Sequence, residues 1–526
     1  VFGKAQGLPS ERIYALAEDM EGTIWVGTEA GVVGYDGCTV RPPEGTEILE
    51  DRYVLSLFVD SRNQLWIGTW GNGLYVHDGR KGLQSILRTE FIGLSDITED
   101  RKGRIWFCFQ NVGGFWCYKE GRTRHFPSYD DTEVLSPSSD EDLYPRWIGA
   151  LLVDSKGGLW VGTSSLSRWQ GLRRYNIEAL LSSKNDDDFV SFTSADGLAG
   201  GVVLSLYEDR EGRIWVGTTE GVSCYNGRKF RTFIREDGLP HEVVTAITQT
   251  DDGKLWFGTE GGGVCCYDGK VLQTIRVPGD QEYNVVYAVH QDRRGRIWFG
   301  TGGGLVRYKP HQERPKISVT EVLADRIYEV GKGNAVEVPT TAGRISFRFG
   351  GKSPTQRASG LVYRYRLEGY EGEWRQTRDT RVDYPPLRPG SYRFCVQAVD
   401  CDLNYSDVAE VVLKVVEDPR IVGLTEALRS SGASGEFVGK SSALRKVLNQ
   451  VHRVAPTELT VLILGETGTG KGLVARAVHG LSTRRGGPFI QINCGAIPEG
   501  LVESELFGHE RGAVSYTHLR AHETRH

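Results

Sequence analysis

The sequence predicts a multidomain protein: an all-β seven-bladed propeller, then an Ig-like β-sandwich, then a truncated α/β domain. Three observations lead to this prediction. A tryptophan-centred repeat recurs through the first part of the chain, a segment of alternating tyrosines follows it, and a glycine-rich loop lies between an apolar run and a helical pattern. The length of 526 residues accommodates several domains, at about 150 residues each.

The composition favours folded, turn-rich β structure. Of the 526 residues, 67 are glycine, 39 % are hydrophobic and 25 % are charged, a balance that supports packed cores and excludes wholesale disorder. The formal net charge of −5 excludes nucleic-acid binding by bulk positive charge. The nine cysteines form no C-x-x-C pair, which favours a reducing compartment. No apolar run approaches the ~18 residues that a membrane span needs.

The first predicted domain, residues 1–313, consists of copies of Gly-x-(Ile/Leu)-Trp-(Val/Phe)-Gly-Thr. An Asp usually precedes the Trp by six residues, and a Tyr follows it nine to fifteen residues later. The repeat tryptophans are Trp25, Trp66, Trp106, Trp160, Trp215, Trp256 and Trp298. Short strands broken by Gly and Asp turns predict a small sheet in each repeat. Such a sheet buries both faces only when copies stack around a ring, which predicts the propeller.

Two expectations follow for this ring. The repeated Trp and Tyr side chains should pack between blades, and carbohydrate stacking by a few of them stays open. Residues 1–5 should supply the outer strand of the last blade and close the ring.

The second predicted domain, residues 314–417, is a small antiparallel sandwich. In Val362–Glu368, tyrosine and leucine alternate with charged residues, which is the pattern of a half-buried strand. The same alternation returns in residues 392–398, after the turn Arg388-Pro389-Gly390. The apolar residues 408–416 are too few to cross a membrane. A linker, residues 418–435, separates this domain from the next.

The third predicted domain contains a glycine-rich loop. Thr460–Leu464 predicts a strand, Gly465–Lys471 a loop, and Leu473–His479 a helix. In this order, backbone N–H groups can surround phosphate oxygens, and the helix N-terminus adds its dipole. Lys471 can place its charge on the β- and γ-phosphates. The candidate phosphate-binding residues are Gly465, Glu466, Thr467, Gly468, Thr469, Gly470, Lys471 and Gly472.

Position 472 departs from the general phosphate-loop motif. The motif ends in a Ser or Thr whose hydroxyl binds Mg²⁺, and this chain has Gly472 there. The metal must therefore be held in another way.

Family resemblances extend these predictions. The repeat, with Gly-Leu-Pro at residues 7–9 and 238–240, resembles the propeller of bacterial two-component sensor proteins. The sandwich around Tyr363, Tyr365 and Tyr392 resembles the triple-tyrosine (Y_Y_Y) domain that follows such propellers. Residues 436–513 resemble the AAA+ ATPase domain of sigma-54-dependent transcription activators, through the loop and through residues 488–494 and 503–513. Residues 514–526 depart from that pattern, and we expect them to be a non-native tail.

The resemblance to sigma-54 activators implies a function for the intact parent protein. It implies ATP as the cofactor, with Mg²⁺, and places Val438 and Gly439 near the adenine and Asn493 at a switch that responds to the nucleotide. In that family, a homo-hexamer hydrolyses ATP and activates sigma-54 RNA polymerase at promoter DNA. The propeller would sense an unknown ligand or protein, in the cytoplasm and without membrane attachment. We expect this chain to bind ATP weakly and to lack catalytic residues, because the Walker B acid, the arginine finger and the complete polymerase-contacting loop are missing from its sequence.

Two other interpretations compete with this one. The propeller could recognise a protein or carbohydrate beside a non-functional nucleotide domain, an alternative that Gly472 favours. The C-terminal His522-Glu523-x-x-His526 also satisfies the zinc-protease signature, and His518 would extend a helical metal stripe. The sequence ends on the second His and offers no third ligand, so we predict no metal site there.

Overall fold

The computed structural model describes residues 1–79, 81–90, 92–109, 114–126, 149–163, 171–182, 189–277, 279, 281–330, 335–354, 360–418, 442–466 and 468–491. The chain divides into two compact units. Unit 1 comprises Val1–Thr320, Arg348–Arg381 and Phe394–Glu410, and unit 2 comprises Glu321–Phe347, Val382–Arg393 and Val411–His526.

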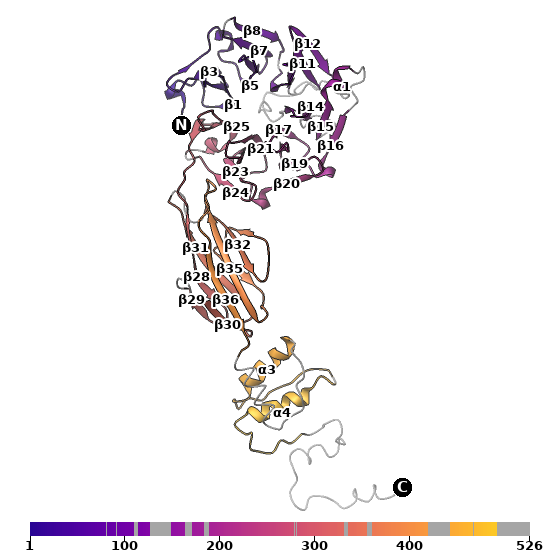
Figure 1. The fold of residues 1–526 in the computed structure, drawn as a ribbon, viewed down its shortest axis with the longest axis vertical. Helices are drawn as coiled ribbons and strands as arrows, with labels where there is room; N and C mark the ends of the chain where they lie inside the picture. Colours follow the sequence, from indigo (N-terminus) through magenta and orange to yellow (C-terminus); the bar gives the residue numbers. More distant parts are fainter. Residues whose placement is uncertain are drawn as a thin grey trace, which may run out of the picture. The chain divides into compact units, whose positions relative to one another are not determined.

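Seven antiparallel sheets succeed one another in unit 1 and form a propeller, as predicted (Figure 1). Six sheets have four strands and the seventh has three. In chain order the blades are β1 (Ile13–Glu18), β2 (Ile24–Thr28), β3 (Gly31–Tyr35), β4 (Val40–Arg41); β5 (Val54–Val59), β6 (Leu65–Thr69), β7 (Leu74–Asp78), β8 (Gly82–Leu87); β9 (Leu94–Glu99), β10 (Ile105–Phe109), β11 (Phe115–Lys119), β12 (Arg122–Phe126); β13 (Leu151–Val153), β14 (Gly158–Gly162), β15 (Leu172–Asn176), β16 (Phe189–Phe192); β17 (Val203–Glu208), β18 (Ile214–Thr218), β19 (Gly221–Tyr225), β20 (Phe230–Phe233); β21 (Val244–Gln249), β22 (Leu255–Thr259), β23 (Val264–Tyr267), β24 (Leu272–Ile275); β25 (Val286–Gln291), β26 (Ile297–Thr301), β27 (Gly304–Tyr308).

The first strand of each blade is the innermost one. First strands of successive blades contact each other around the ring, and β1 contacts β25, which closes it. In Figure 1, β1, β17 and β25 lie toward the middle of the ring, and β8, β16 and β20 lie toward its rim. Short helices connect the strands: η1 (Lys4–Gln6), η2 (Glu47–Leu49), α1 (Ile177–Ser182), η4 (Ser194–Asp196), η5 (Arg235–Asp237) and η6 (Gln281–Asn284).

The Asp and Trp of the repeat are hydrogen-bonded to each other in six of the seven blades. In blade 5, Trp215 Nε1 donates a hydrogen bond of 2.7 Å to Asp209 Oδ2. Asp209 Oδ1 accepts the backbone N–H groups of Glu211 and Arg213 in the turn between the first two strands. The same Trp–Asp bond forms in five other blades, and in blade 6 Thr250 accepts the bond from Trp256 instead. Each Asp therefore fixes a turn and a core tryptophan at once.

The glycine two residues after the Trp allows the blades to stack. A Cβ added at Gly27 would lie 2.8 Å from a methyl carbon of Val54 in the next innermost strand, which is closer than carbon atoms approach. Gly300 has the same relation to Ile13, at 2.9 Å, across the junction between the last blade and the first. The repeat keeps glycine here because the neighbouring blade occupies the space. Blade 3 is an exception, since Cys108 stands at this position.

The N-terminus closes the ring. Phe2 N donates to Leu305 O at 2.7 Å, and Leu305 N donates to Phe2 O at 2.9 Å, so Phe2 occupies the outer edge of the three-stranded last blade. Residues 1–5 therefore join the last blade as predicted, through a single bridge rather than a full strand. The expected packing of the repeat tryptophans is also confirmed, because six of the seven are at most 3 % exposed.

Strands β28 to β36 follow the propeller and form two sheets. One has the order β29-β28-β31-β34, and the other has the order β30-β36-β35-β32-β33. Strands β30 and β36 are parallel, so the prediction of a purely antiparallel module is wrong at this pair. Their bounds are β28 (Lys316–Leu323), β29 (Ile327–Glu329), β30 (Ala335–Pro339), β31 (Ile345–Lys352), β32 (Val362–Glu368), β33 (Arg375–Thr377), β34 (Arg381–Tyr384), β35 (Gly390–Val399) and β36 (Ala409–Val416).

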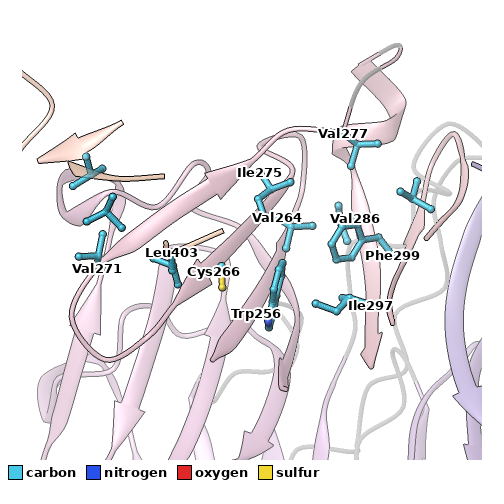
Figure 2. Packing of buried hydrophobic residues seen from close by; sticks show 13 residues of the cluster. Trp256, Val264, Cys266, Val271, Ile275, Val277, Val286, Ile297, Phe299 and Leu403 are labelled. Carbon is cyan, nitrogen blue, oxygen red and sulfur yellow. The ribbon is translucent and has the colours of Figure 1, made fainter. Parts of the chain in front are cut away.

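Part of this second module belongs to unit 1. Leu403, in the turn after β35, is 5 % exposed and lies in the same hydrophobic cluster as Trp256 and Phe299 of blades 6 and 7 (Figure 2). Tyr405 Oη also donates to Asp268 Oδ2 at 2.5 Å, in the turn between β23 and β24. These contacts make the turn after β35 part of the propeller core.

The last described segment has two helices, α3 (Ser442–Val454) and α4 (Lys471–Leu481). The predicted strand at Thr460–Leu464 is wrong, because these residues adopt no regular structure. Leu462 is 80 % and Leu464 82 % exposed. A strand needs a neighbour to accept and donate its backbone hydrogen bonds, and among the described residues no segment pairs with this run. Within those same residues, no helix combines the length and the apolar character needed to cross a membrane.

Candidate functional site

The glycine-rich loop lies between residues 465 and 470, directly before α4. Gly468 has φ 90° and Gly470 has φ 85°, conformations that a side chain would strain. Gly465 is required for another reason, since an added Cβ would lie 2.8 Å from Thr469 Oγ1. That hydroxyl donates to Glu466 O at 2.7 Å. The three glycines and Thr469 therefore produce one tight, exposed turn of backbone.

Lys471 is the charged group of the loop. Its Nζ donates to Gly465 O at 2.7 Å and to Glu466 O at 2.6 Å. Both acceptors are neutral carbonyls, and the ammonium thus lies beside the loop backbone. One positive charge is held at the position where the chain turns into the helix.

The N-terminus of α4 adds backbone donors to this charge. Gly470 is the N-cap residue, and the N–H groups of Leu473 and Val474 donate to Gly470 O at 3.0 and 3.2 Å. The N–H groups of Lys471 and Gly472, which precede these two and open the helix, have no carbonyl one turn earlier to bond, and they carry the positive end of the helix dipole. Exposed donors, the dipole and Lys471 together fit an anion such as phosphate.

Packing against α3 holds α4 in place. Leu448 and Val451 of α3 are 5 % and 2 % exposed, and Ala477 of α4 is 1 % exposed. The segment after α4 also returns to it, because the rings of Phe489 and His479 lie 5.3 Å apart. The loop is therefore anchored through its helix.

The donor set does not include the usual metal ligand. Gly472 has no side-chain oxygen, and the nearest atom to an added Cβ would be Gln491 Nε2 at 3.8 Å. Space for a hydroxyl-bearing side chain exists there. Within the described ranges, no three His, Cys, Asp or Glu side chains come together as a metal site.

The structure brings Gly465, Glu466 and the residues from Gly468 to Gly472 together at one turn. Four other predicted site residues, Val438, Gly439, Thr467 and Asn493, lie outside the described residues, as do His518, His522, Glu523 and His526. Sequence reasoning missed the acceptor role of the Gly465 and Glu466 carbonyls. No side-chain pattern signals it, because the contact is made by the backbone.

Family models match three parts of the chain. The model described as the sigma-54 interaction domain matches residues 437–523. The Y_Y_Y domain matches residues 356–416. The two component regulator propeller matches residues 7–30, 48–71, 197–220, 238–261 and 280–303.

Curated relatives match a minor part of the chain. The formate hydrogenlyase transcriptional activator of Salmonella typhimurium is 50 % identical over 119 residues, which is 22 % of this chain and 17 % of that protein. The DNA-binding transcriptional regulator NtrC of a Bradyrhizobium strain is 40 % identical over 141 residues, 26 % of this chain and 28 % of that protein. A Nif-specific regulatory protein of Azospirillum brasilense is 59 % identical over 80 residues, 15 % of this chain and 13 % of that protein. This chain spans less than a third of the length of each of these relatives.

Solved structures resemble this chain weakly. The extracellular domain of a putative hybrid two component system from B. thetaiotaomicron has 21 % identity and a TM-score of 0.48, covering 78 % of this chain and 56 % of that one. A streptogramin B lyase has 16 % identity and a TM-score of 0.45, covering 57 % of this chain and 94 % of that one. From the family matches, this chain joins the propeller repeats of two-component regulators and a Y_Y_Y domain to a sigma-54 interaction domain segment.

Proposed function

We propose that the chain belongs to a signal-responsive transcription regulator that binds ATP at Gly465–Gly472 and acts on sigma-54 RNA polymerase. The observation that carries this proposal is the position of Lys471, whose ammonium lies against the loop backbone at the start of α4. This arrangement occurs within the segment that matches the sigma-54 interaction domain. Curated relatives of the chain are named as a transcriptional activator and a transcriptional regulator.

The residues of the loop would divide the work of holding ATP. The backbone N–H groups at the start of α4 would donate to phosphate oxygens, and Lys471 would exchange its two carbonyl acceptors for the β- and γ-phosphates. Val438 and Gly439 would contact the adenine, and Asn493 would respond to the nucleotide state. Mg²⁺ would arrive with the nucleotide, because Gly472 supplies no hydroxyl.

The propeller would serve as the sensor and the ATPase domain as the output. Hydrolysis needs an acidic group for the metal and water and an arginine from a neighbouring subunit, so we propose hydrolysis and promoter activation only for a chain that carries these groups. Such a regulator would act as a homo-hexamer in the cytoplasm, where ATP, promoter DNA and polymerase are found.

Nucleotide titration tests the loop. ATP affinity is measured by calorimetry for the full chain, for Lys471→Ala and for Lys446→Ala, in which an exposed lysine of α3 is removed. We expect Lys471→Ala to weaken ATP at least tenfold, about 1.4 kcal/mol, and Lys446→Ala to change nothing. Adenosine should bind far more weakly than ATP. Equal ATP affinity of the wild-type chain and Lys471→Ala would remove the phosphate site from the proposal.

A further inference from the structure

The propeller carries aromatic side chains at one end of its innermost strands. Tyr14 and Tyr287 are the second residues of β1 and β25, and Tyr53 directly precedes β5. Because these strands start at the same end of the ring, the three tyrosines share that end. They come from blades 1, 7 and 2, which are consecutive around the closed ring.

The three rings form a row. The Tyr14 and Tyr287 ring centroids lie 5.1 Å apart, with 53° between the ring planes. Tyr14 and Tyr53 lie 6.3 Å apart at 31°. Tyr53 is 46 % exposed, while Tyr14 and Tyr287 are half-buried. Tyr53, at one end of the row, is thus the ring most open to solvent.

The repeat does not require Tyr14 and Tyr287. Tyr14 and Tyr287 occupy the same position of the repeat. Each directly follows the residue that pairs with the Thr at the end of the second strand of its blade. The equivalent residues in blades 2, 5 and 6 are Leu55, Leu204 and Thr245. A blade therefore folds with leucine or threonine at this position. Tyr14 and Tyr287 therefore need an explanation other than the requirements of the blade.

A guanidinium lies beside the row. Arg12 directly precedes β1, and its Nη1 is 4.0 Å from Glu29 Oε2. This distance exceeds a hydrogen bond, and the other Glu29 oxygen accepts from Ser10 Oγ at 2.8 Å. The Arg12 side chain is 41 % exposed, and burial, with the neighbouring Tyr287 next in importance, raises the pKa of Tyr14 to about 12. Near neutral pH the Tyr14 hydroxyl thus stays protonated beside a cation that has no direct carboxylate hydrogen bond.

We propose that this end of the propeller binds a small aromatic carboxylate, with its ring against the tyrosine row and its carboxylate on Arg12. Aromatic rings prefer tilted or offset contacts with other rings, and the fork of N–H groups on arginine matches the two oxygens of a carboxylate. The three tyrosines and one arginine suit a ligand of one or two rings. The inference rests on the proposed function, because it names the ligand class of the proposed sensor domain.

Benzoate is the probe, titrated into the full chain by calorimetry or ligand-observed NMR. Benzamide has the same shape without the charge, and cyclohexanecarboxylate has the charge without the flat ring. We expect each to bind at least tenfold more weakly than benzoate. Binding of either analogue as tight as benzoate would overturn the inference, and so would the absence of benzoate binding at millimolar concentration.

Variants locate the site. Arg12→Gln should weaken benzoate at least tenfold, and Tyr14→Leu at least fivefold. Tyr14→Leu should fold normally because Leu55 and Leu204 occupy the equivalent position. Arg41→Gln and Tyr370→Leu, both exposed positions elsewhere, are the matched controls and should change nothing. Unchanged benzoate affinity in Arg12→Gln would refute the site.

The nucleotide titration separates this inference from the proposed function. If benzoate binds as described and Lys471→Ala leaves the ATP affinity unchanged, the propeller site is supported and the ATP site is refuted. If ATP binding depends on Lys471 and benzoate does not bind, the proposed ATP-binding regulator is supported and the proposed aromatic carboxylate ligand is refuted.

Discussion

Asp96 gives the propeller a pH-dependent stability that one substitution should remove. It pairs with Cys108 in blade 3. At the equivalent positions, blade 2 has Ser56 opposite Gly68 and blade 5 has Ser205 opposite Gly217. Its two carboxylate oxygens accept the backbone N–H groups of Ile97 and Leu151, each at 2.9 Å. Burial outweighs these two hydrogen bonds and raises the pKa of Asp96 from 3.8 to about 7.

The sign of the effect follows from proton linkage. The folded protein binds the Asp96 proton more tightly than the unfolded chain, so this stabilisation is complete below pH 4 and is lost as the pH rises to about 7. The change in pKa from 3.8 to about 7 corresponds to roughly 4 kcal/mol, at ~1.4 kcal/mol per unit of pKa. Asp96→Asn has no proton to lose. It gives up one backbone hydrogen bond, about 1 kcal/mol at every pH.

The assay is urea unfolding at several pH values between 5 and 8. Tryptophan fluorescence reports on the propeller, because 11 of the 12 tryptophans precede residue 314. We expect Asp96→Asn to match the wild-type chain to within about 1 kcal/mol at pH 5 and to be more stable by about 2–4 kcal/mol at pH 8. Asp96→Ser, the residue of blades 2 and 5, should behave likewise.

Asp36→Asn is the matched control. The backbone N–H groups of Thr39 and Cys38 lower the pKa of this exposed carboxylate to about 2, so its contribution changes only below pH 4. Its unfolding midpoint should follow the wild-type midpoint across the whole range from pH 5 to pH 8. If the difference in stability between Asp96→Asn and the wild-type chain stays constant with pH, the buried proton is not on Asp96.

Three further predictions concern the repeat and the loop. Asp209→Ala removes the acceptor of Trp215 Nε1 and of two turn N–H groups, and we expect it to destabilise the propeller by about 2–4 kcal/mol in urea unfolding. The control Thr250→Ala removes only a hydroxyl beside Trp256 and should cost about 1 kcal/mol. Equal losses of stability in the two variants would contradict the role given to the carboxylate. Gly300→Ala places a Cβ 2.9 Å from Ile13 at the ring closure and should lower the unfolding midpoint clearly, while Gly343→Ala, with open space around it, should not. Gly472→Thr supplies the missing hydroxyl and should make ATP binding several-fold tighter only when Mg²⁺ is present. Gly472→Ala is the control. Tighter ATP binding by Gly472→Thr without Mg²⁺ would argue against metal binding at this position.

The sequence predicted the blades because their chemistry is local. The Asp, the turn, the Trp and the Gly of one repeat lie within ten residues, so their spacing specifies the turn and the buried ring directly. The strand predicted at Thr460–Leu464 failed for the opposite reason, since a strand depends on a partner distant in the sequence. The row of Tyr14, Tyr53 and Tyr287 could not be predicted either, because the last blade meets the first only after the ring closes.

The raised pKa of Asp96 could be predicted only in part from the sequence. The register of the repeat places an acid where other blades have Ala or Ser, and alignment of the repeats would single it out. Its pKa depends on burial by blade 4, whose Leu151 N–H donates to it across 55 positions of sequence. A local pattern can therefore identify the unusual residue without giving its protonation state.

The contacts of Lys471 predict how ATP binding should respond to salt. In the described structure the ammonium donates to two neutral carbonyls, at 2.7 and 2.6 Å. Phosphate oxygens are charged acceptors, and hydrogen bonds between two charged groups are roughly twice as strong as those between neutral groups, so the exchange favours the nucleotide. Because this gain comes from charge in an exposed loop, salt should screen it. We expect ATP affinity to fall between about 0.05 and 0.5 M NaCl and the slope to shrink in Lys471→Ala, since one phosphate contact is then lost. An affinity that does not change with salt would mean that the base and ribose, rather than the phosphates, hold the nucleotide.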